Sequence, residues 1–518
     1  MELEAFKNLT FTDFRQPENH RAMSEALAKV RGQLGQQYDI IIGGEQIRCE
    51  YQFQSLNPSR REEVVGVFQK GTPGEVDRAI SAADEAFSQW SRLPAEERVA
   101  YMLTVSRIMK ERRLELAAWM VIEVGKSWVE ADADVAEGID FCEFYSREML
   151  RLAAPQSLVE IESEENALEY IPLGVGVIIP PWNFPLAILA GMTFAAVVSG
   201  NTVVLKPSSD SPTIAAKLME IFEEAGYPPG VVNFLTGSGG EIGDTLVKHT
   251  RTRFISFTGS KEVGLRIIEL AAKHRSGQIW IKRVIAEMGG KDAIVVDSDS
   301  DLDEAATDVV AASFGYQGQK CSACSRAIVV DSVYDEFVQK LLEKTRTMIV
   351  PGSVEQDDIN FGPVINQRAQ ETIQHFIQVG KKEGKLVMGG EVAASEGFFV
   401  PPTIIVDVDR KATIAQEEIF GPVLAVIRAG NYDEAIEIAN DTEYGLTGAV
   451  YTRDQSKIEQ AKREFHVGNL YINRKCTGAL VGVHPFGGFN MSGTDSKAGG
   501  RDYLLLFTQG KSISQKVT

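Results

Sequence analysis

The 518-residue chain has few cysteines and no long uninterrupted apolar run. Its five cysteines are an odd, sparse set, which excludes a small disulfide-stapled scaffold and is typical of a reducing compartment. The most apolar stretch, Phe184–Val198, contains Pro185 and is too short to span a bilayer. The first residues include Glu2 and Glu4 and lack the apolar core of a signal peptide. We therefore expect a cytoplasmic protein with no membrane partner.

Positive charge is also scarce, because 53 Lys and Arg residues stand against 72 Asp and Glu residues and leave a net charge of −19. The phosphate backbone of a nucleic acid repels such a surface, so nucleic acid is not expected as a partner. Apolar residues make up 44% of the chain and charged residues 24%, which is ordinary for a globular protein and excludes disorder. The length predicts about three domains.

Short apolar strands alternate with helix-length segments from residue 174 onward, in two successive series. The first series comprises residues 174–180, 202–207, 231–237 and 254–260. The second series starts near Ala286 and includes residues 293–297, 326–330, 423–427 and 448–452. This alternation predicts an α/β fold with doubly wound parallel sheets. Such sheets bind ligands beyond the carboxyl ends of their strands.

Upstream of this region the pattern predicts mostly helices. A hairpin over residues 38–50 and a strand over 64–68 precede a helix that Thr72 and Glu75 would cap at its start. Helical apolar spacing predicts two longer helices, over residues 95–113 and 114–152.

Residues 157–173 alternate apolar and polar side chains like a two-stranded ribbon, and residues 503–517 have similar strand character. Such exposed ribbons often build an oligomer interface. The alternative is that both segments are edge strands of a main sheet.

Cys321 is the strongest candidate for a nucleophile. Gly315 and Gly318 bracket its loop, and a thiolate in a cleft is a strong nucleophile. A single cysteine is otherwise more often a small buried apolar residue. Cys321 and Cys324 form a CxxC pair, which could also indicate zinc or redox exchange. No second pair exists and the six histidines are scattered, so no metal is expected.

Two other polar residues could support such a nucleophile. Glu287 lies in IAEMGGKD before a predicted strand, and a carboxylate in a covered cleft can act as a general base. Asn183 lies in the rigid PPWNFP loop, and its amide could donate to a developing oxyanion. Taken alone, a solvated carboxylate and a turn-capping asparagine are the commoner interpretations.

Glycine-rich segments after two of the strands suggest a nucleotide site. GSGGEIG at 237–243 follows a strand but lacks the GxGxxG spacing, so it is a weak fingerprint. FTGSKEVG at 257–264 opens a helix at Ser260, where a phosphate would be favoured. Lys206 ends another strand and could reach ribose hydroxyls or a phosphate.

Taken together, these segments resemble the aldehyde dehydrogenase superfamily from about Tyr38 to the C-terminus. Order and spacing fit, including the 321 − 287 = 34 positions that separate the glutamate from the cysteine. The motifs are PWNFP, KPSSD, FTGS, EMGGKD, GQKCSACSR, EEIFGPV, NDTEYGLTG and HPFGGFNMSGT. Residues 468–500 and Ser322 further resemble the branch that oxidises L-glutamate γ-semialdehyde to glutamate in proline catabolism. Another semialdehyde, such as succinic semialdehyde, is the alternative substrate.

The resemblance implies a covalent mechanism. Cys321 would attack the aldehyde to give a thiohemiacetal and then a thioester, Asn183 and the backbone N–H of Cys321 would stabilise the oxyanion, and Glu287 would activate a water. Ser322, Gly478 and Ala479 would anchor the substrate carboxylate, with Phe184 and Phe486 on either side of its aliphatic chain. The implied cofactor contacts are Ile179, Pro180, Trp182, Lys206, Ser208, Ser209, Gly239, Gly243, Ser260, Met288, Gly289, Glu418 and Phe420.

NAD is the cofactor that the resemblance favours. Many relatives carry a carboxylate where this chain has Ser209, so NADP stays open as an alternative. The implied aldehyde dehydrogenase-like fold has a dinucleotide-binding domain (1–152 and 171–285), a catalytic domain (286–485) and an oligomerisation arm (153–170 and 500–518). The arm would join a homodimer or a larger homo-oligomer.

Overall fold

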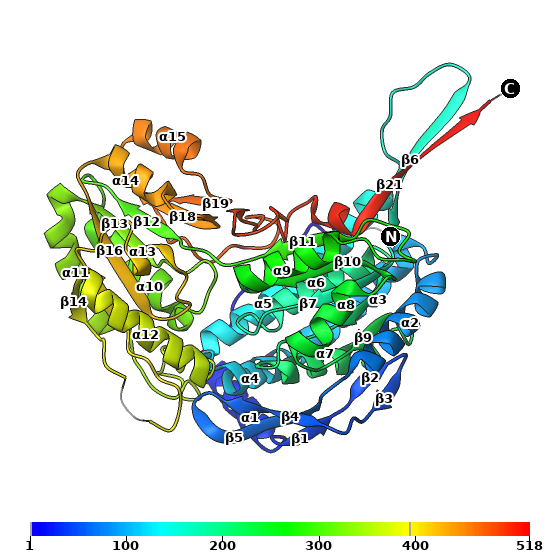
Figure 1. Cartoon of the computed structure of the whole chain (residues 1–518), viewed down its shortest axis with the longest axis horizontal. Helices are drawn as coiled ribbons and strands as arrows, with labels where there is room; N and C mark the ends of the chain where they lie inside the picture. The colour runs from blue at the N-terminus through cyan, green and yellow to red at the C-terminus, as the bar shows by residue number, and fades with distance from the viewer. Residues whose placement is uncertain (1–2, 393–394, 518) are drawn as a thin grey trace.

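The computed structural model describes residues 3–392 and 395–517. The predicted domain ranges also include residues 1–2, 393–394 and 518, which lie outside the described residues. The same holds for Glu2, which was used to argue against a signal peptide. Two seven-stranded sheets form the two halves of the molecule, and a two-stranded ribbon projects from one half (Figure 1). Within the described ranges, no helix is long and apolar enough to cross a membrane.

The first sheet has the order β11-β10-β7-β8-β9-β2-β3. Its parallel strands are β7 (Val175–Ile179), β8 (Thr202–Leu205), β9 (Val232–Phe234), β10 (Thr252–Thr258) and β11 (Arg283–Glu287). The hairpin strands β2 (Ile40–Ile42) and β3 (Glu45–Ile47) add an antiparallel edge. The predicted parallel strands are therefore confirmed, and the hairpin predicted over residues 38–50 extends the sheet with an antiparallel edge.

The second sheet has the order β14-β15-β16-β13-β12-β18-β19. Its strands are β12 (Ala293–Val296), β13 (Arg326–Val330), β14 (Lys385–Met388), β15 (Thr403–Val406), β16 (Val423–Ala429), β18 (Thr447–Tyr451) and β19 (Asn469–Ile472). Only β14, at one edge, is antiparallel to its neighbour among these described strands. This sheet thus repeats the architecture of the first.

Helices cover both sheets. Those of the first half are α1 (Pro17–Arg31), α2 (Pro73–Trp90), α3 (Ala95–Glu111), α4 (Arg113–Val124), α5 (Trp128–Ala153), α6 (Ala187–Val198), α7 (Pro212–Glu224), α8 (Asp244–Lys248) and α9 (Lys261–Ala272). Those of the second half are α10 (Leu302–Phe314), α11 (Tyr334–Met348), α12 (Gln367–Glu383), α13 (Thr413–Gln416), α14 (Tyr432–Asn440) and α15 (Gln455–Glu464).

Each sheet is buried on both faces, as its uninterrupted apolar strands require. In β12, Ile294 and Val296 pack into one core cluster while Val295 packs into the cluster on the opposite face. In the first sheet, Ile178 faces the helices α3–α7 and Val177 faces α2 and α9. Successive side chains along a strand point to opposite faces, so each sheet contributes to a separate apolar core on either side.

Local capping confirms one predicted helix and corrects another. At the start of α2, the Thr72 hydroxyl accepts from Gly74 N at 3.2 Å and the Glu75 carboxylate accepts from Thr72 N at 2.9 Å. The single helix predicted over 114–152 is wrong, because the chain breaks between α4 and α5. Gly125 adopts φ 67° there, and a Cβ at that position would lie 2.8 Å from Pro363 Cγ. Ser127 then caps the start of α5.

The ribbon consists of β6 (Glu164–Pro172) and β21 (Thr508–Lys516), paired antiparallel along their whole length. The prediction that residues 157–173 pair with one another is wrong, and so is the edge-strand alternative, because the partner of β6 is the C-terminal strand and the pair joins neither seven-stranded sheet. Three smaller strands, β1 (Gln36–Tyr38), β4 (Gln52–Asn57) and β5 (Arg60–Gln69), form another sheet, and β17 (Tyr444–Gly445) pairs with β20 (Phe489–Asn490).

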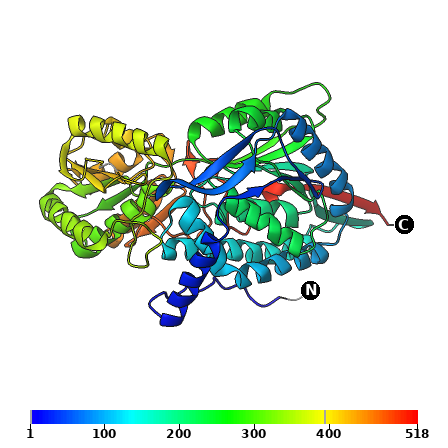
Figure 2. The same ribbon diagram turned by 90° about the horizontal axis from the view of Figure 1, so that it is seen from below.

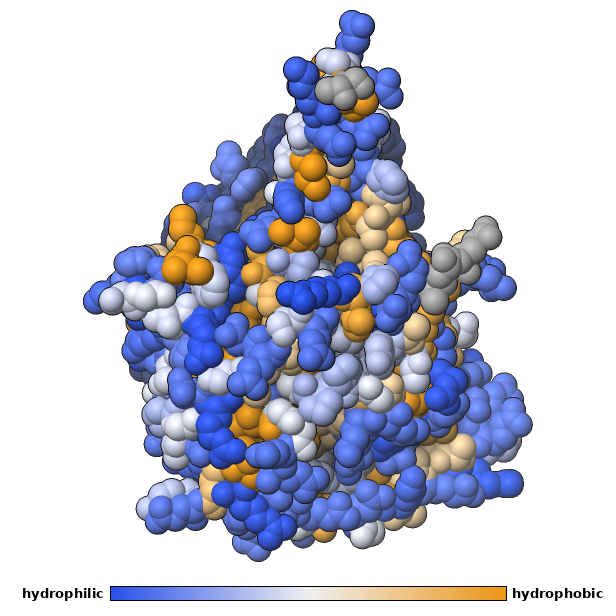
Figure 3. Space-filling model, turned by 90° about the vertical axis from the view of Figure 1, so that its right-hand side faces the viewer, coloured by the Kyte–Doolittle hydropathy of each residue, from blue (hydrophilic) through white to orange (hydrophobic). Residues whose placement is uncertain are grey.

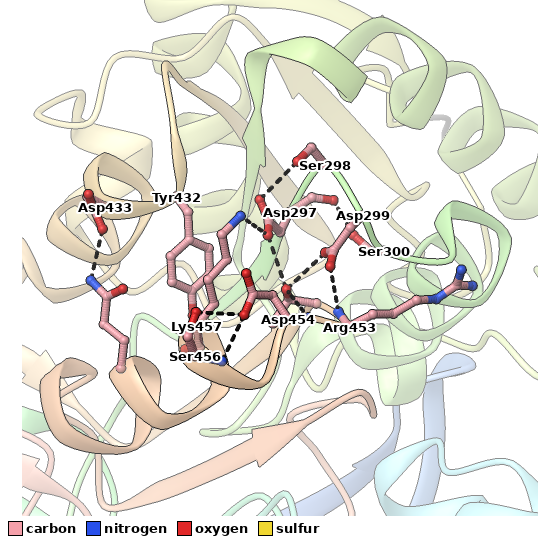
Figure 4. A network of polar contacts seen from close by, with 12 residues as sticks. Asp297, Ser298, Asp299, Ser300, Tyr432, Asp433, Arg453, Asp454, Ser456 and Lys457 are labelled. Atoms are coloured by element: carbon pink, nitrogen blue, oxygen red, sulfur yellow. Dashed lines mark hydrogen bonds and ion pairs between the residues drawn. The ribbon is translucent and has the colours of Figure 1, made fainter.

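A polar network fills the carboxyl edge of the second sheet beside β12 and β18 (Figure 4). Asp297, only 1% exposed, accepts from Lys457 Nζ at 2.6 Å and from Thr452 Oγ1 at 3.1 Å. Asp299 accepts from the same hydroxyl at 2.9 Å and from Arg453 N at 3.0 Å. At the carboxyl ends of these two strands, polar side chains of the protein itself therefore occupy the place where such sheets often bind a ligand.

Candidate active site

The candidate site lies between the two sheets. The carboxyl ends of the parallel strands in the first sheet lead into the predicted residues: β7 into Asn183, β8 into Lys206, β10 into Ser260 and β11 into Glu287. In the second sheet, Cys321 precedes the amino end of β13 and Glu418 precedes that of β16. The expectation that ligands bind beyond the carboxyl ends of parallel strands therefore holds for the predicted residues of the first sheet and not for those of the second.

A large cavity of about 710 Å³ collects nearly all the predicted cofactor residues. The predicted residues that line it are Ile179, Pro180, Trp182, Lys206, Ser208, Ser209, Gly239, Ser260, Met288, Gly289, Glu418 and Phe420, together with Asn183 and Cys321. Gly243 does not line this cavity; it ends the short π-helical turn that starts at Gly239.

A second, smaller cavity of about 130 Å³ collects all the predicted substrate residues. Its predicted lining residues are Phe184, Glu287, Cys321, Ser322, Gly478, Ala479 and Phe486. Cys321 and Thr258 line both cavities. A thiol therefore stands where the larger cavity meets the smaller, mostly apolar one.

The loop before Cys321 is strained. Tyr316 and Gln317 have φ of 50° and 55°, and a Cβ on Gly318 would lie 2.4 Å from Gly421 O. The Tyr316 hydroxyl fixes the loop by donating to Val124 O at 2.9 Å. Strain held by surrounding contacts is typical of functional loops. Burial, with the nearby carboxylates of Asp292 and Glu418, raises the pKa of the Cys321 thiol, so attack on an electrophile requires a proton acceptor.

The Asn183 amide points toward the cysteine loop. Its side chain is 4% exposed, and Nδ2 donates to the backbone carbonyl of Gln319 at 2.9 Å. Gln319 is held in turn, because its Oε1 accepts from Ile365 N at 2.9 Å. One amide hydrogen of Asn183 thereby fixes the side chain beside Cys321, and the second remains to be donated to a reacting atom.

A buried ion pair fixes the backbone at the end of the loop that carries Asn183. Lys126 Nζ lies 2.7 Å from Asp134 Oδ2, with both side chains fully buried, and the other Asp134 oxygen accepts from Ala187 N at 2.6 Å. Lys126 Nζ also lies 4.0 Å from the centre of the Phe184 ring, within cation–π range. The turn between α4 and α5 that the sequence did not predict supplies this lysine.

Glu287, the last residue of β11, has the properties of a general base. Burial raises the pKa of its carboxyl to about 7, although a hydrogen bond from the Ser496 hydroxyl to Oε1 acts in the opposite direction. Its Oε2 is buried and has no hydrogen-bond partner in the described part of the chain. A base with a pKa near neutrality combines a usable proton affinity with a substantial ionised fraction.

The carboxylate of Glu418 packs against Gly289 and Gly290, where a side chain would not fit. It accepts from Gly290 N at 3.1 Å, and a Cβ on Gly289 would lie only 1.9 Å from Glu418 Oε2. Burial raises the pKa of Glu418 to about 7. In the same large cavity, burial lowers the pKa of Lys206 to about 8, and its Nζ donates to Pro207 O at 3.0 Å. The cavity thus receives polar groups from both sheets.

Sequence reasoning missed Glu137, which lines the smaller cavity from α5. Burial raises the pKa of its carboxyl to about 8, and the charge of Asp134 acts in the same direction. The same cavity wall includes Phe141 and Tyr145 of α5, and Tyr503. Glu137, Phe141 and Tyr145 recur at the i, i+4, i+8 spacing of one helix face, which is the only signal that could have found the glutamate. Across the described residues, no group of three or more His, Cys, Asp or Glu side chains is arranged to hold a metal ion.

Comparison with known proteins defines the class. The model of the aldehyde dehydrogenase family matches residues 47–513, and the chain belongs to this family. It is 54% identical over 513 residues to 1-pyrroline-5-carboxylate dehydrogenase of Geobacillus thermodenitrificans, covering 99% of each chain. The solved structure of 1-pyrroline-5-carboxylate dehydrogenase from Thermus with bound NAD matches with a TM-score of 0.98 at 49% identity, covering 100% of each chain.

More distant members share the fold. Betaine aldehyde dehydrogenase from Staphylococcus aureus in complex with NAD+ matches with a TM-score of 0.89 at 29% identity, over 96% of this chain and 98% of that one. The family and fold predicted from the motifs are confirmed.

Proposed function

We propose that this chain oxidises L-glutamate γ-semialdehyde to L-glutamate with NAD, through a covalent thioester on Cys321, in proline catabolism. The observation that carries the proposal is the position of Cys321 where a nucleotide-sized cavity meets a short cavity lined by Glu287. The proposal is supported by the names of the relatives that match over the whole chain and by the NAD in the Thermus structure. Steady-state assays with NAD, NADP and a panel of semialdehydes test it.

The residues of the junction would perform the acylation. Cys321 Sγ would lose its proton to solvent water and attack the aldehyde carbon, and the oxygen would develop negative charge beside the Asn183 amide and the backbone N–H of Cys321. Collapse of this intermediate would release the hydride of the former aldehyde carbon to a bound nicotinamide and leave an acyl group on the sulfur. Glu287 then removes a proton from water as the water attacks the thioester, which releases the acid and the free thiol.

The larger cavity fits a dinucleotide in its donor chemistry. Ser260 stands at the N-terminus of α9, where a helix favours phosphate, and Lys206 and Glu418 can bind ribose hydroxyls. NAD, when bound, accepts the hydride from the reacting carbon. Ser209 is uncharged and so would not repel the 2′-phosphate of NADP near Lys206. NADP therefore stays the alternative cofactor.

The smaller cavity suits an amino-acid semialdehyde. Phe184 and Phe486 line it and would flank an aliphatic chain, while Ser322 and the backbone of Gly478 and Ala479 would bind the α-carboxylate. Burial keeps Glu137 largely protonated in the empty cavity at neutral pH, and the charge of an α-ammonium group beside it would favour its ionised, ammonium-binding form. Succinic semialdehyde has no ammonium group, so Glu137 is the residue that separates the two candidate substrates.

Asn183→Ala is expected to lower kcat/KM for the semialdehyde about 10²- to 10³-fold, because it removes one oxyanion donor. Asn183→Asp should be impaired as strongly, since a carboxylate keeps the shape but cannot donate. Steady-state kinetics with saturating NAD measure both variants. Near-normal activity in Asn183→Asp would show that the amide is not an oxyanion donor.

Glu137→Gln is expected to raise KM for glutamate γ-semialdehyde about 10-fold or more, the loss expected for a hydrogen bond between charged partners. KM for succinic semialdehyde should not rise. Glu148→Gln is the matched control, because Glu148 is on the same helix and pairs with Arg151 outside the cavity. Equal KM changes for both substrates would exclude ammonium recognition by Glu137.

The domain organisation and assembly are also proposed from the motif resemblance. We assign residues 1–152 and 171–285 to dinucleotide binding and 286–485 to catalysis, although β11 crosses residue 285. The arm, 153–170 and 500–518, would join a homodimer or larger homo-oligomer. Its apolar residues Val159 and Ile161 are 89% and 55% exposed, and apolar side chains occur along the projecting arm in Figure 3. We expect a cytoplasmic location from the sparse cysteines.

A further inference from the structure

The N-terminal segment, residues 3–16, contains neither helix nor strand, yet it is firmly attached. It precedes α1 and lies outside the residues that the family model matches. In Figure 2 it is the dark-blue line that approaches α1 along the lower edge of the molecule. Irregular terminal segments remain loose unless specific contacts hold them.

Two buried carboxylates of α5 hold this segment. Asp132 accepts from the backbone N and the hydroxyl of Thr12, at 2.7 and 2.8 Å. Asp140 accepts from Leu9 N at 3.0 Å and from Asn8 Nδ2 at 2.9 Å. These aspartates are 140 − 132 = 8 residues apart and so lie on one face of the helix. The segment therefore has a defined path along α5.

The same path brings the segment to the loop that would bind the substrate carboxylate. We define the anchor loop as residues 477–484; it too lacks helix and strand. In the described part of the chain, the backbone N–H groups of Gly478 and Ala479 donate to no protein acceptor. Since no side-chain donor stands at either position, carboxylate binding there depends on the backbone conformation of the loop.

A backbone bond from Gly482 N to Gly499 O at 2.8 Å fixes the loop, and side chains of three residues outside positions 478–479 add contacts to it. The Arg474 guanidinium donates to Thr477 O at 2.9 Å and to Gly478 O at 3.2 Å. His484 Nδ1 accepts from Leu480 N at 3.2 Å. The third contact comes from the N-terminal segment, where Asn8 Nδ2 donates to Val481 O at 3.0 Å.

Aromatic packing reinforces the Asn8 contact. The Phe6 and Phe144 rings pack edge to face with centroids 5.3 Å apart, and both lie against Gly482. A Cβ on Gly482 would lie 3.2 Å from the Phe6 ring and 3.1 Å from the Phe144 ring, and its φ is 77°. The close approach and the positive φ both favour glycine, so the segment and the loop fit one another closely.

We propose that Phe6 and Asn8 are positioning residues for substrate selectivity: the N-terminal segment holds the anchor loop in the conformation that binds the α-carboxylate of the substrate. The inference rests on the proposed function, because it assumes that Gly478 and Ala479 bind this carboxylate. Neither residue contacts the reacting atoms, so the segment would affect the binding of carboxylate substrates and leave the chemistry at Cys321 unchanged.

The test compares Asn8→Ala and Phe6→Ala/Asn8→Ala with Thr12→Ala in the full-length chain. Loss of one ordinary hydrogen bond corresponds to about a five-fold change in binding. We expect Asn8→Ala to raise KM for glutamate γ-semialdehyde about five-fold and the double variant to raise it further. The inhibition constant of the product L-glutamate should rise by the same factor. KM for NAD and kcat/KM for propanal, which has no carboxylate, should stay unchanged.

Thr12→Ala is the matched control, because Thr12 ties the same segment to α5 without contacting the anchor loop. It should lower the thermal unfolding midpoint as Asn8→Ala does, yet leave KM for the semialdehyde unchanged. Unchanged KM in the double variant, or an equal loss with propanal, would overturn the inference. If the unmodified protein oxidised propanal but not glutamate γ-semialdehyde, the proposed function itself would fail, and the inference with it.

Discussion

Replacing Cys321 by serine is expected to lower NAD-dependent aldehyde oxidation at least about 10³-fold, because an alkoxide forms far less readily than a thiolate and no acyl thioester can be made. The substitution exchanges a single sulfur atom for oxygen and leaves the rest of the side chain unchanged, so the fold and the affinity for NAD should persist. Steady-state kinetics and calorimetric titration with NAD measure the two effects separately.

Cys324→Ser is the matched control for this variant. Cys324 lies three residues further on and is buried, its sulfur contacts Arg326 O at 3.4 Å, and serine is the residue closest to it in shape. It should retain most of the activity. If both cysteine variants lost activity equally, a redox pair would replace the single-nucleophile interpretation.

Glu287→Gln is expected to lower kcat about 10²- to 10⁴-fold by removing the general base. In this assignment solvent water accepts the Cys321 proton and Glu287 acts only on the thioester, so rapid mixing should still show a burst of NADH of one equivalent per active site. Absence of the burst, with the same fall in kcat, would place Glu287 in the attack step.

The pH dependence supplies an independent check on Glu287. The base acts in its ionised form, and burial raises its pKa to about 7, so kcat should fall as pH drops below about 7. Ser496 donates a hydrogen bond that lowers the pKa of Glu287, so Ser496→Ala should move this limb to higher pH. A flat profile between pH 6 and 8 would contradict the assignment.

The sequence predicted the parts of the fold that depend on local pattern. Apolar runs such as 175–179 and 293–296 identified parallel strands, and the capping box at Thr72 identified a helix start. The break at Gly125 escaped prediction because apolar periodicity continues across it, although a glycine that ends one helix and a serine that caps the next are local signals for such a break. The pairing of β6 with the C-terminal strand, by contrast, depends on a long-range contact that no local pattern encodes.

The candidate site was predictable where family motifs mark it. Cys321, Glu287 and Asn183 lie in distinctive segments, and the structure brings their loops together around two adjoining cavities. Glu137 and Lys126 escaped, because each is one charged residue in a helical region rich in charge. Their importance arises from burial, which only the packing of α5 against α6 reveals. Gly243 belongs to the matched motif but does not line the cavity, and its cofactor contact stays a prediction.

The central claim is that the sulfur of Cys321 carries the substrate as an acyl group during turnover. The most direct measurement is mass spectrometry of the intact Glu287→Gln protein, quenched in acid after mixing with NAD and glutamate γ-semialdehyde, followed by peptide mapping. We expect the mass of one glutamyl group, located on Cys321, in most of the protein. No covalent mass at this residue, while NADH is still formed, would contradict the account.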